Sequence, residues 1–179
     1  GYTPTFSDTL ELITIASTGS AQDFGNLVEG RWDPTAMASP TRAVWVQGAK
    51  APANQKSDTM DYITIGNTGN ALDYGETHEV RGRISGHCSD GNRGMYSGGQ
   101  NPGAISTMGF FKISTFGNGV DFGELTQARG YGAMVANGSR ALLGGGQNPS
   151  YVDTCDYFPI GVTGTDAVDF GELAAASRR

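Results

Sequence analysis

Asp121-Phe122-Gly123-Glu124-Leu125 is one of four copies of a short motif in this chain. The copies begin at Asp23, Asp73, Asp121 and Asp169, so their spacings are 50, 48 and 48 residues. Self-similarity at a fixed period of roughly 20–50 residues is the signature of a repeat architecture. The chain therefore divides into repeat units of about 49 residues.

Other features recur at fixed distances from this motif. An apolar run precedes each copy and is followed by a glycine-bearing turn; the runs are 10–15, 60–65, 108–113 and 155–160. An Arg lies eight residues after the motif Asp in three copies, and we assign its counterpart in the fourth to Arg178, one position later. A second Arg closes a turn further on in each full unit: Arg42, Arg93 and Arg140.

Each unit is predicted to form four short strands. In the last unit the strands are expected at about 129–136, 140–146, 152–160 and 168–173. Asn137-Gly138 between the first two is a strong hairpin signal, because both residues tolerate positive φ. No helical periodicity is sustained anywhere, so the fold class is all-β. Four strands in about 49 residues are typical of a β-propeller blade.

The order of these features resembles the kelch repeat. Arg129, Gly145-Gly146, Tyr157, Phe170 and Leu173 lie where the kelch pattern has its Arg, glycine pair, Tyr, Trp and Leu. The residue sequence of the repeats, for example Asp61-Tyr62-Ile63-Thr64-Ile65, is similar to that of galactose oxidase/kelch-like proteins of tailed phages, cyanophages among them. This resemblance implies a kelch-like β-propeller, or part of one.

The predicted organisation is a single repeat array over 1–179. It comprises a half blade at 1–30, full blades at 31–80 and 81–128, and a blade with a C-terminal tail at 129–179. Propellers usually have at least about four blades, so we expect a larger ring completed by more chain or by another copy. Alternatively, residues 174–179 supply an inner strand beside the N-terminal half blade. Without a partner, the first and last strands are open edges.

Composition excludes several classes of protein. The chain has 28 Gly in 179 residues, a net charge of −6, nine Arg and three Lys, with no basic run. We therefore expect no nucleic-acid partner. No apolar stretch approaches about 18 residues, so we expect no membrane insertion. Cys88 and Cys155 do not make a disulfide framework, and both free thiols and a single bridge remain open.

No catalytic set, metal site or cofactor is predicted. Asp-Phe-Gly occurs at a fixed period without the other kinase motifs. The motif aspartates could form a ring of metal ligands, or each could cap its own turn and pair with a repeat Arg. His87-Cys88 with Asp90 and His78 comes from one unit, which fits neither a zinc site nor a copper oxidase well. Asn137-Gly138-Ser139 is a glycosylation triplet as well as a turn.

Binding is instead expected at the ends of the blades. Aromatic rings with amide side chains suit sugar faces and protein interfaces. The candidate binding residues are Trp32, Gln100, Asn101, Tyr131, Gln147, Asn148 and Tyr151. Alternatively, Trp32 and Tyr131 simply pack on the next blade. The positions assigned to the repeat itself are Asp23, Phe24, Gly25, Arg31, Asp73, Tyr74, Gly75, Arg81, Asp121, Phe122, Gly123, Arg129, Asp169, Phe170 and Gly171.

The resemblance and the missing catalytic set together favour a non-enzymatic structural or adhesion component of a phage virion, such as a tail fibre, or of an extracellular appendage. Its expected partners are other virion proteins or host surface glycans, and it is expected to be oligomeric or part of a larger assembly. The alternatives are a soluble carbohydrate-active enzyme and a cytoplasmic kelch-type adaptor.

Overall fold

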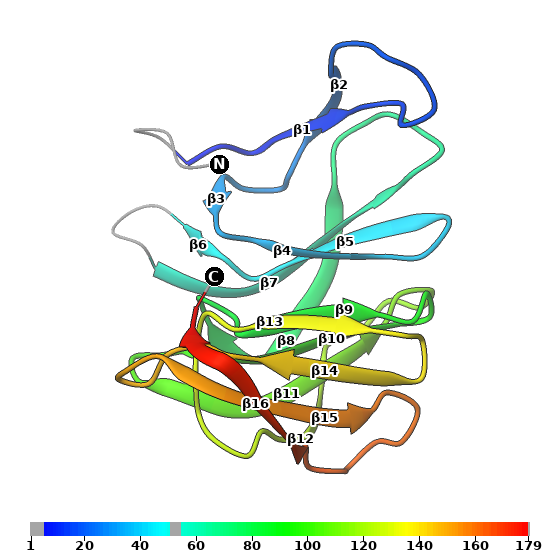
Figure 1. Cartoon of the computed structure of the whole chain (residues 1–179). Coiled ribbons are helices and arrows are strands. Elements are labelled where there is room, and N and C mark those ends of the chain that lie inside the picture. The colour runs from blue at the N-terminus through cyan, green and yellow to red at the C-terminus, as the bar shows by residue number, and fades with distance from the viewer. Residues whose placement is uncertain (1–5, 51–54, 179) are drawn as a thin grey trace.

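The computed structural model describes residues 6–50 and 55–178, which form an all-β fold (Figure 1). No helix occurs in these two ranges, and therefore none long and apolar enough to cross a membrane. The Pro-containing segment at 1–4 lies outside the described residues. The strands are β1 (Thr9–Leu12), β2 (Gln22–Asn26), β3 (Arg31–Trp32), β4 (Thr35–Ala38), β5 (Arg42–Val46), β6 (Ala49–Lys50), β7 (Gln55–Thr64), β8 (Leu72–Arg81), β9 (Gly86–Ser89), β10 (Arg93–Gln100), β11 (Ala104–Lys112), β12 (Val120–Glu124), β13 (Ala133–Ala136), β14 (Arg140–Gly144), β15 (Val152–Pro159) and β16 (Val168–Ser177).

These strands form antiparallel sheets in chain order. The first sheet is the pair β1–β2, the third is β9–β10–β11–β12, and the fourth is β13–β14–β15–β16. The second sheet has the order β4–β5–β7–β8, and the short strands β3 and β6 join the start of β7. Strand β9 lies between β4 and β13, so the first strands of successive sheets are neighbours.

The last unit shows how well local chemistry sets the strands. Observed strands 140–144 and 152–159 fall within the predicted 140–146 and 152–160. The turn before β14 forms because Asn137 Oδ1 accepts hydrogen bonds from the backbone N–H groups of Ser139 and Arg140, while Gly138 adopts a φ of 88°. Strand β13 begins only at Ala133, four residues later than predicted.

The C-terminal segment belongs to the fourth sheet. Strand β16 continues to Ser177, which pairs with Val152 of β15. Residues 174–177 therefore extend their own sheet and do not form an inner strand beside the first sheet.

The core lies between the sheets. One cluster joins the third and fourth sheets around Met95, Met108, Phe122 and Phe158, all 0–1% exposed. A second joins the second and third sheets, and a smaller one joins the first and second. Each of the first three sheets therefore buries one face against the next sheet in the chain (Figure 1).

The repeat arginines connect neighbouring sheets. Arg31, Arg81 and Arg129 are 0–1% exposed. The backbone of Arg129 donates to Ile105 in the third sheet, while its guanidinium forms an ion pair of 2.9 Å with Asp156 in the fourth. Arg31 likewise donates to Ser7 through its backbone and pairs with Asp61 at 2.7 Å. A buried charge is tolerated only when it is paired in this way.

The prediction for the motif aspartates is confirmed for the turn cap and wrong for the pairing with the repeat arginines. Asp23, Asp73 and Asp169 each accept a hydrogen bond from the backbone N–H two residues on, at 2.9–3.1 Å. They therefore cap their own turns, as Asx side chains do. The acids that pair with arginine are Asp61 and Asp156, which lie opposite Asp73 and Asp169 on the adjacent strands.

Arg178 is not the fourth repeat arginine. The carbonyl of Arg129 accepts a hydrogen bond from Gly99, and in the fourth sheet the carbonyl of Ser177 accepts the equivalent bond from Gly146. Ser177 therefore occupies the repeat-arginine position, eight residues after Asp169, and Arg178 lies one residue beyond it on the surface.

Candidate functional site

The connections that follow the repeat arginines gather at one end of the sheets, together with the loops between the second and third strands. Isolated bridges join Gly82 to Gln100 and Gly130 to Gln147, and β3 pairs with β6 at the same end of the second sheet. We call this surface the loop end.

Four non-glycine residues of the described ranges have a positive φ, all at the loop end; one of them, Gln47, is buried, and the other three share one position in the repeat. Asp33, Arg83 and Tyr131 each lie two residues after a repeat arginine, and their φ angles are 54°, 54° and 60°. A left-handed conformation costs a residue with a Cβ about 1–2 kcal/mol. Such strain clusters at functional sites, so the side chains at this position are the first candidates for function.

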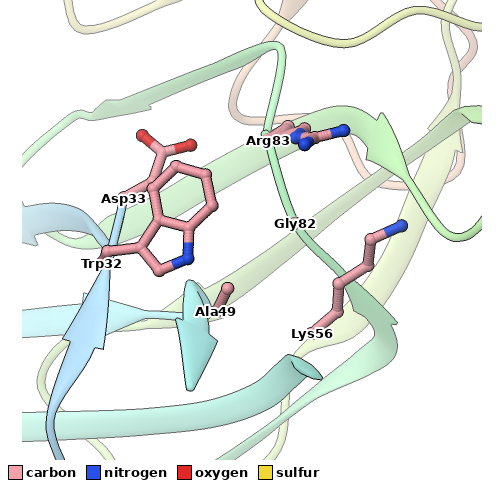
Figure 2. A pocket seen from close by; sticks show the side chains of 6 residues that line it. All are labelled: Trp32, Asp33, Ala49, Lys56, Gly82 and Arg83. Atoms are coloured by element: carbon pink, nitrogen blue, oxygen red, sulfur yellow. The ribbon is translucent and has the colours of Figure 1, made fainter. Parts of the chain in front are cut away.

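A hollow of about 80 Å³ lies beside the first of these residues. Figure 2 shows the Trp32 ring on one side and Lys56 and Arg83 on the other, with Ala49 and Gly82 between them. Burial, followed by the charge of Arg83, lowers the pKa of Lys56. The hollow thus combines a large aromatic ring with two basic groups, and Asp33 at its rim.

A row of arginine and tyrosine side chains continues along the loop end. The Arg83 guanidinium lies 5.6 Å from the Tyr131 ring centre. On the other side, Arg178 lies 5.1 Å from the Tyr131 ring and 5.3 Å from the Tyr151 ring. Cation–π contacts of this kind hold flat groups in place with their edges accessible.

The predicted amide residues are used in two ways. Gln100 Oε1 accepts a bond of 2.9 Å from Arg83, and Gln147 Oε1 accepts one of 2.6 Å from Arg178, so both glutamines fix the arginine row. Asn101 and Asn148 instead donate to the Val80 and Ala128 carbonyls. Their side chains therefore tie each loop to the residue just before a repeat arginine, Arg81 or Arg129.

The structure brings Trp32, Tyr131, Tyr151 and the Gln-Asn loops to the same end of the molecule. Sequence reasoning missed Lys56, Arg83 and Arg178. Arg83 could have been found by aligning the three full units on their repeat arginines. It lies two residues after Arg81, the same position that Asp33 and Tyr131 occupy in the other two units. Lys56 carries no such signal, since it reaches the hollow only through the pairing of β6 with β7.

A second, buried cluster surrounds Arg81. Arg81 Nη2 donates to Glu79 Oε2 at 2.8 Å and lies 3.2 Å from His78 Nε2, while His78 Nδ1 lies 2.9 Å from the Tyr96 hydroxyl. Because arginine can only donate, Nε2 is the acceptor and Nδ1 carries the proton. Burial and the charge of Arg81 lower the pKa of His78, which keeps the ring neutral.

This cluster replaces the ion pair of the neighbouring sheets. Gly109 lies opposite Asp121, where the second and fourth sheets have Asp61 and Asp156. A Cβ at Gly109 would come within 2.4 Å of the Tyr96 ring and 2.5 Å of the His78 ring. Tyr96 and His78 fill the space of the missing aspartate, and Glu79 supplies the carboxylate to Arg81.

The other candidate groups have local roles. Asp90 Oδ1 accepts bonds from the Asn92 and Arg93 backbone, and His87 is half-buried on β9. Cys88 and Cys155 are free thiols, and burial raises the pKa of Cys88 to about 12. Within 6–50 and 55–178, no three His, Cys, Asp or Glu side chains are grouped so that they could hold a metal ion.

No protein-family model and no curated protein sequence matches this chain. The candidate site therefore rests on the geometry of the loop end.

Proposed function

We propose that this chain is a non-enzymatic adhesion and structural module of a phage virion or extracellular appendage, which binds host surface glycans through its loop end. Its framework would be three kelch-like propeller blades and a half blade. Three four-stranded arrangements and one strand pair, in the order of the sequence repeats, support that architecture. The virion setting is supported by the resemblance of the repeats.

The observation that carries the binding proposal is the backbone at Asp33, Arg83 and Tyr131. Glycine would adopt these φ angles without strain, yet each unit places a functional side chain there. The resulting side chains line one continuous end, beside the Trp32 hollow. The turn itself contributes to the fold, since the Tyr131 N–H donates to the Arg83 carbonyl at 3.3 Å. What supports a binding role is that these strained positions carry side chains that lie together at one end.

The chemistry of the hollow favours an acidic sugar. The Trp32 ring offers an apolar surface for the face of a pyranose. Lys56 and Arg83, whose charged ends point away from this ring in Figure 2, would offer charge to a carboxylate or sulfate at the edge of the hollow. A volume of about 80 Å³ is well below the ~300 Å³ of typical small-molecule pockets. The hollow would therefore take one substituent of the sugar, while the rest lies over the arginine–tyrosine row.

Shallow contacts of this kind are weak one at a time. A rigid framework limits the entropy lost on binding, and several copies on one particle would add avidity. The His78 and Glu79 side chains are bonded to Tyr96 and Arg81 and so take part in the contact between the second and third sheets. Such a structural role favours a binding module over the carbohydrate-active enzyme.

The test is binding of the purified chain to an array of neutral, uronate-containing, sialylated and sulfated oligosaccharides. Trp32→Ala and Lys56→Ala are expected to weaken binding to an acidic glycan at least about tenfold, equivalent to about 1.4 kcal/mol. Lys112→Ala is the matched control, because Lys112 is exposed at the far end of β11. Binding that Lys112→Ala weakens as much as Lys56→Ala, or no binding to any array member, would contradict the proposal.

A further inference from the structure

The last sheet exposes positions that are buried in every earlier sheet. We call the side of a sheet that the following sheet covers its forward face. The motif aromatic lies on this face and is 6%, 3% and 1% exposed at Phe24, Tyr74 and Phe122. Its counterpart in the fourth sheet, Phe170, is 65% exposed.

The rest of this forward face is open as well. Val135 is 65% exposed, whereas its counterparts Met37 and Cys88 are 3% and 9% exposed. Two adjoining hollows of about 250 and 400 Å³ share Val135 and Leu142, and Phe170 and Leu173 line them. In the first three sheets the following sheet covers the equivalent surface. On the fourth sheet this large apolar surface has no such cover within the described residues.

The first sheet is open on the opposite side, its backward face. Ile13 and Ile15 are 62% and 96% exposed. Their counterparts at the third and fourth sheets pack against the preceding sheet and are 0–2% exposed: Phe111, Phe158, Ile113 and Ile160. The first sheet lies at the top of Figure 1 and the fourth in its lower part, so the two sheets are well separated. Both open faces are accessible, as the exposure of Ile15 and Phe170 shows.

The hydrogen bonds between neighbouring sheets also recur at fixed repeat positions, and the equivalent residues are present on the two open faces. Arg42 donates to the Ile113 carbonyl and Arg93 to the Ile160 carbonyl, both at 2.8 Å. Arg140 is the next arginine in this series and lies on the exposed side of the fourth sheet. The isoleucines at this repeat position are Ile15, Ile65, Ile113 and Ile160, and Ile15 is the one on the open face of the first sheet.

A backbone contact repeats in the same way. The N–H of Ala71 donates to the Asn26 carbonyl at 2.7 Å, and the N–H of Ala167 donates to the Glu124 carbonyl at 2.8 Å. Ala21 and Glu172 hold the same positions at the two open faces. The glycine beside the acceptor is covered by the next sheet at Gly25 and Gly123, but nothing lies within 4 Å of a Cβ built on Gly171.

We propose that the forward face of the fourth sheet binds the backward face of the first sheet in a second copy of this chain. Phe170 would pack against Ile13 and Ile15, Arg140 would donate to the Ile15 carbonyl, and Ala21 would donate to the Glu172 carbonyl. The two faces differ, so the contact is head to tail and builds a filament or closes into a ring. This inference does not depend on the ligand of the loop end.

The expected contact is smaller than an internal junction. The first sheet has only the strands β1 and β2, so it would cover β15 and β16 more fully than β13 and β14. Association is therefore expected to depend on concentration.

The test is sedimentation velocity of the purified chain over a wide concentration range. Wild type is expected to grow beyond the monomer as concentration rises. Phe170→Asp disables one face and Ile15→Asp the other, so each variant alone stays monomeric. A mixture of the two retains one intact pair of faces and is expected to give a 1:1 dimer that grows no further.

Val120→Asp is the matched control. Val120 is 54% exposed on the outer strand of the third sheet, whose forward face is already covered, so this variant should assemble like wild type. If Phe170→Asp loses its folded circular dichroism, Arg140→Ala replaces it in the same mixture. A wild type that stays monomeric, or a Phe170→Asp variant that assembles like Val120→Asp, would overturn the proposal, as would a mixture without dimers. Capture of a different protein by wild type, with no self-association, would also overturn it.

Discussion

Each buried arginine has a carboxylate at 2.7–2.9 Å, but the carboxylates of the three sites differ in burial. Arg31 and Arg129 pair with aspartates that are themselves 0–2% exposed. Burial raises the pKa of Asp61, and the nearby Arg31 charge opposes that rise. Arg81 pairs with Glu79, whose side chain is 36% exposed, so this site keeps contact with solvent. The neutral Tyr96–His78 pair beside it completes the site.

Tyr96 makes stability depend on alkaline pH. Burial raises the pKa of its hydroxyl to about 12, from 10.0 in an unfolded chain. Between these values the folded protein binds more protons than the unfolded one, so the free energy of unfolding falls as pH rises through this window. A shift of this size corresponds to about 2–3 kcal/mol.

Urea unfolding at pH 8, 10 and 11.5 measures this effect. Wild type is expected to lose more stability over the range than Tyr96→Phe, because the variant lacks the group that titrates. Equal losses in both proteins would show that the buried hydroxyl does not set this pH dependence.

At the scale of the element, the third sheet is built around a missing side chain. Tyr96 on β10 lies across from Gly109 on β11, and the Cβ that alanine would add comes within 2.4 Å of the ring. The equivalent pair in the fourth sheet is Leu143 opposite Asp156. In the third sheet the large Tyr96 ring leaves no space for a side chain at position 109. Overpacking of a core costs about 1–3 kcal/mol.

Gly109→Ala is therefore expected to lower the free energy of unfolding by about 1–3 kcal/mol in thermal or urea denaturation. Gly103→Ala, in the loop between β10 and β11, is the control, since nothing lies within 4 Å of its Cβ and its φ is not positive. Adding Tyr96→Leu to Gly109→Ala should relieve the crowding by the Tyr96 ring, while the contact of 2.5 Å with His78 remains. A Gly109→Ala protein as stable as Gly103→Ala would rule this packing out.

The sequence predicted the strands where local signals are strong. Asn137-Gly138 and the alternating apolar residues after Arg140 act over a few residues, so β14 and β15 were placed within one or two residues of their ends. The two-residue strands β3 and β6 have no pattern of their own, and they pair only because the second sheet folds around them. No local signal could have revealed them.

The candidate site was predicted only in part for a similar reason. Trp32 and Tyr131 stand out by residue type, and the repeat period brings them to one end. Lys56 joins the hollow through strand pairing and not through the repeat. Arg178 was assigned by residue type, but backbone hydrogen bonding gives its expected position to Ser177.

At the scale of the whole molecule, Gly123 and Gly171 occupy the same position in a covered and an uncovered sheet. Their φ angles are 148° and 134°. A Cβ at Gly123 would lie 2.5 Å from the Thr165 carbonyl oxygen of the next sheet, whereas one at Gly171 has nothing within 4 Å. The same substitution should therefore report on different contacts at the two sites.

Gly123→Ala is expected to destabilise the folded monomer clearly more than Gly171→Ala, which bears only the backbone strain of about 1–2 kcal/mol. Denaturation of dilute protein measures this difference. Gly171→Ala should instead weaken association between copies in sedimentation experiments. Equal destabilisation by both variants, with association unchanged, would contradict the view that the fourth sheet ends in an open docking face.

The Arg81 site also limits how this gene can evolve by duplication. Gly109 and Tyr96 belong to the third sheet, but His78 and Glu79, which complete the set, come from the last strand of the second. A recombination breakpoint at Arg81 would transfer Tyr96 and Gly109 to another protein without His78 and Glu79, the residues that complete this site. The sections of this chain that can be shuffled intact therefore begin before His78, inside a strand, and not at the loops between sheets.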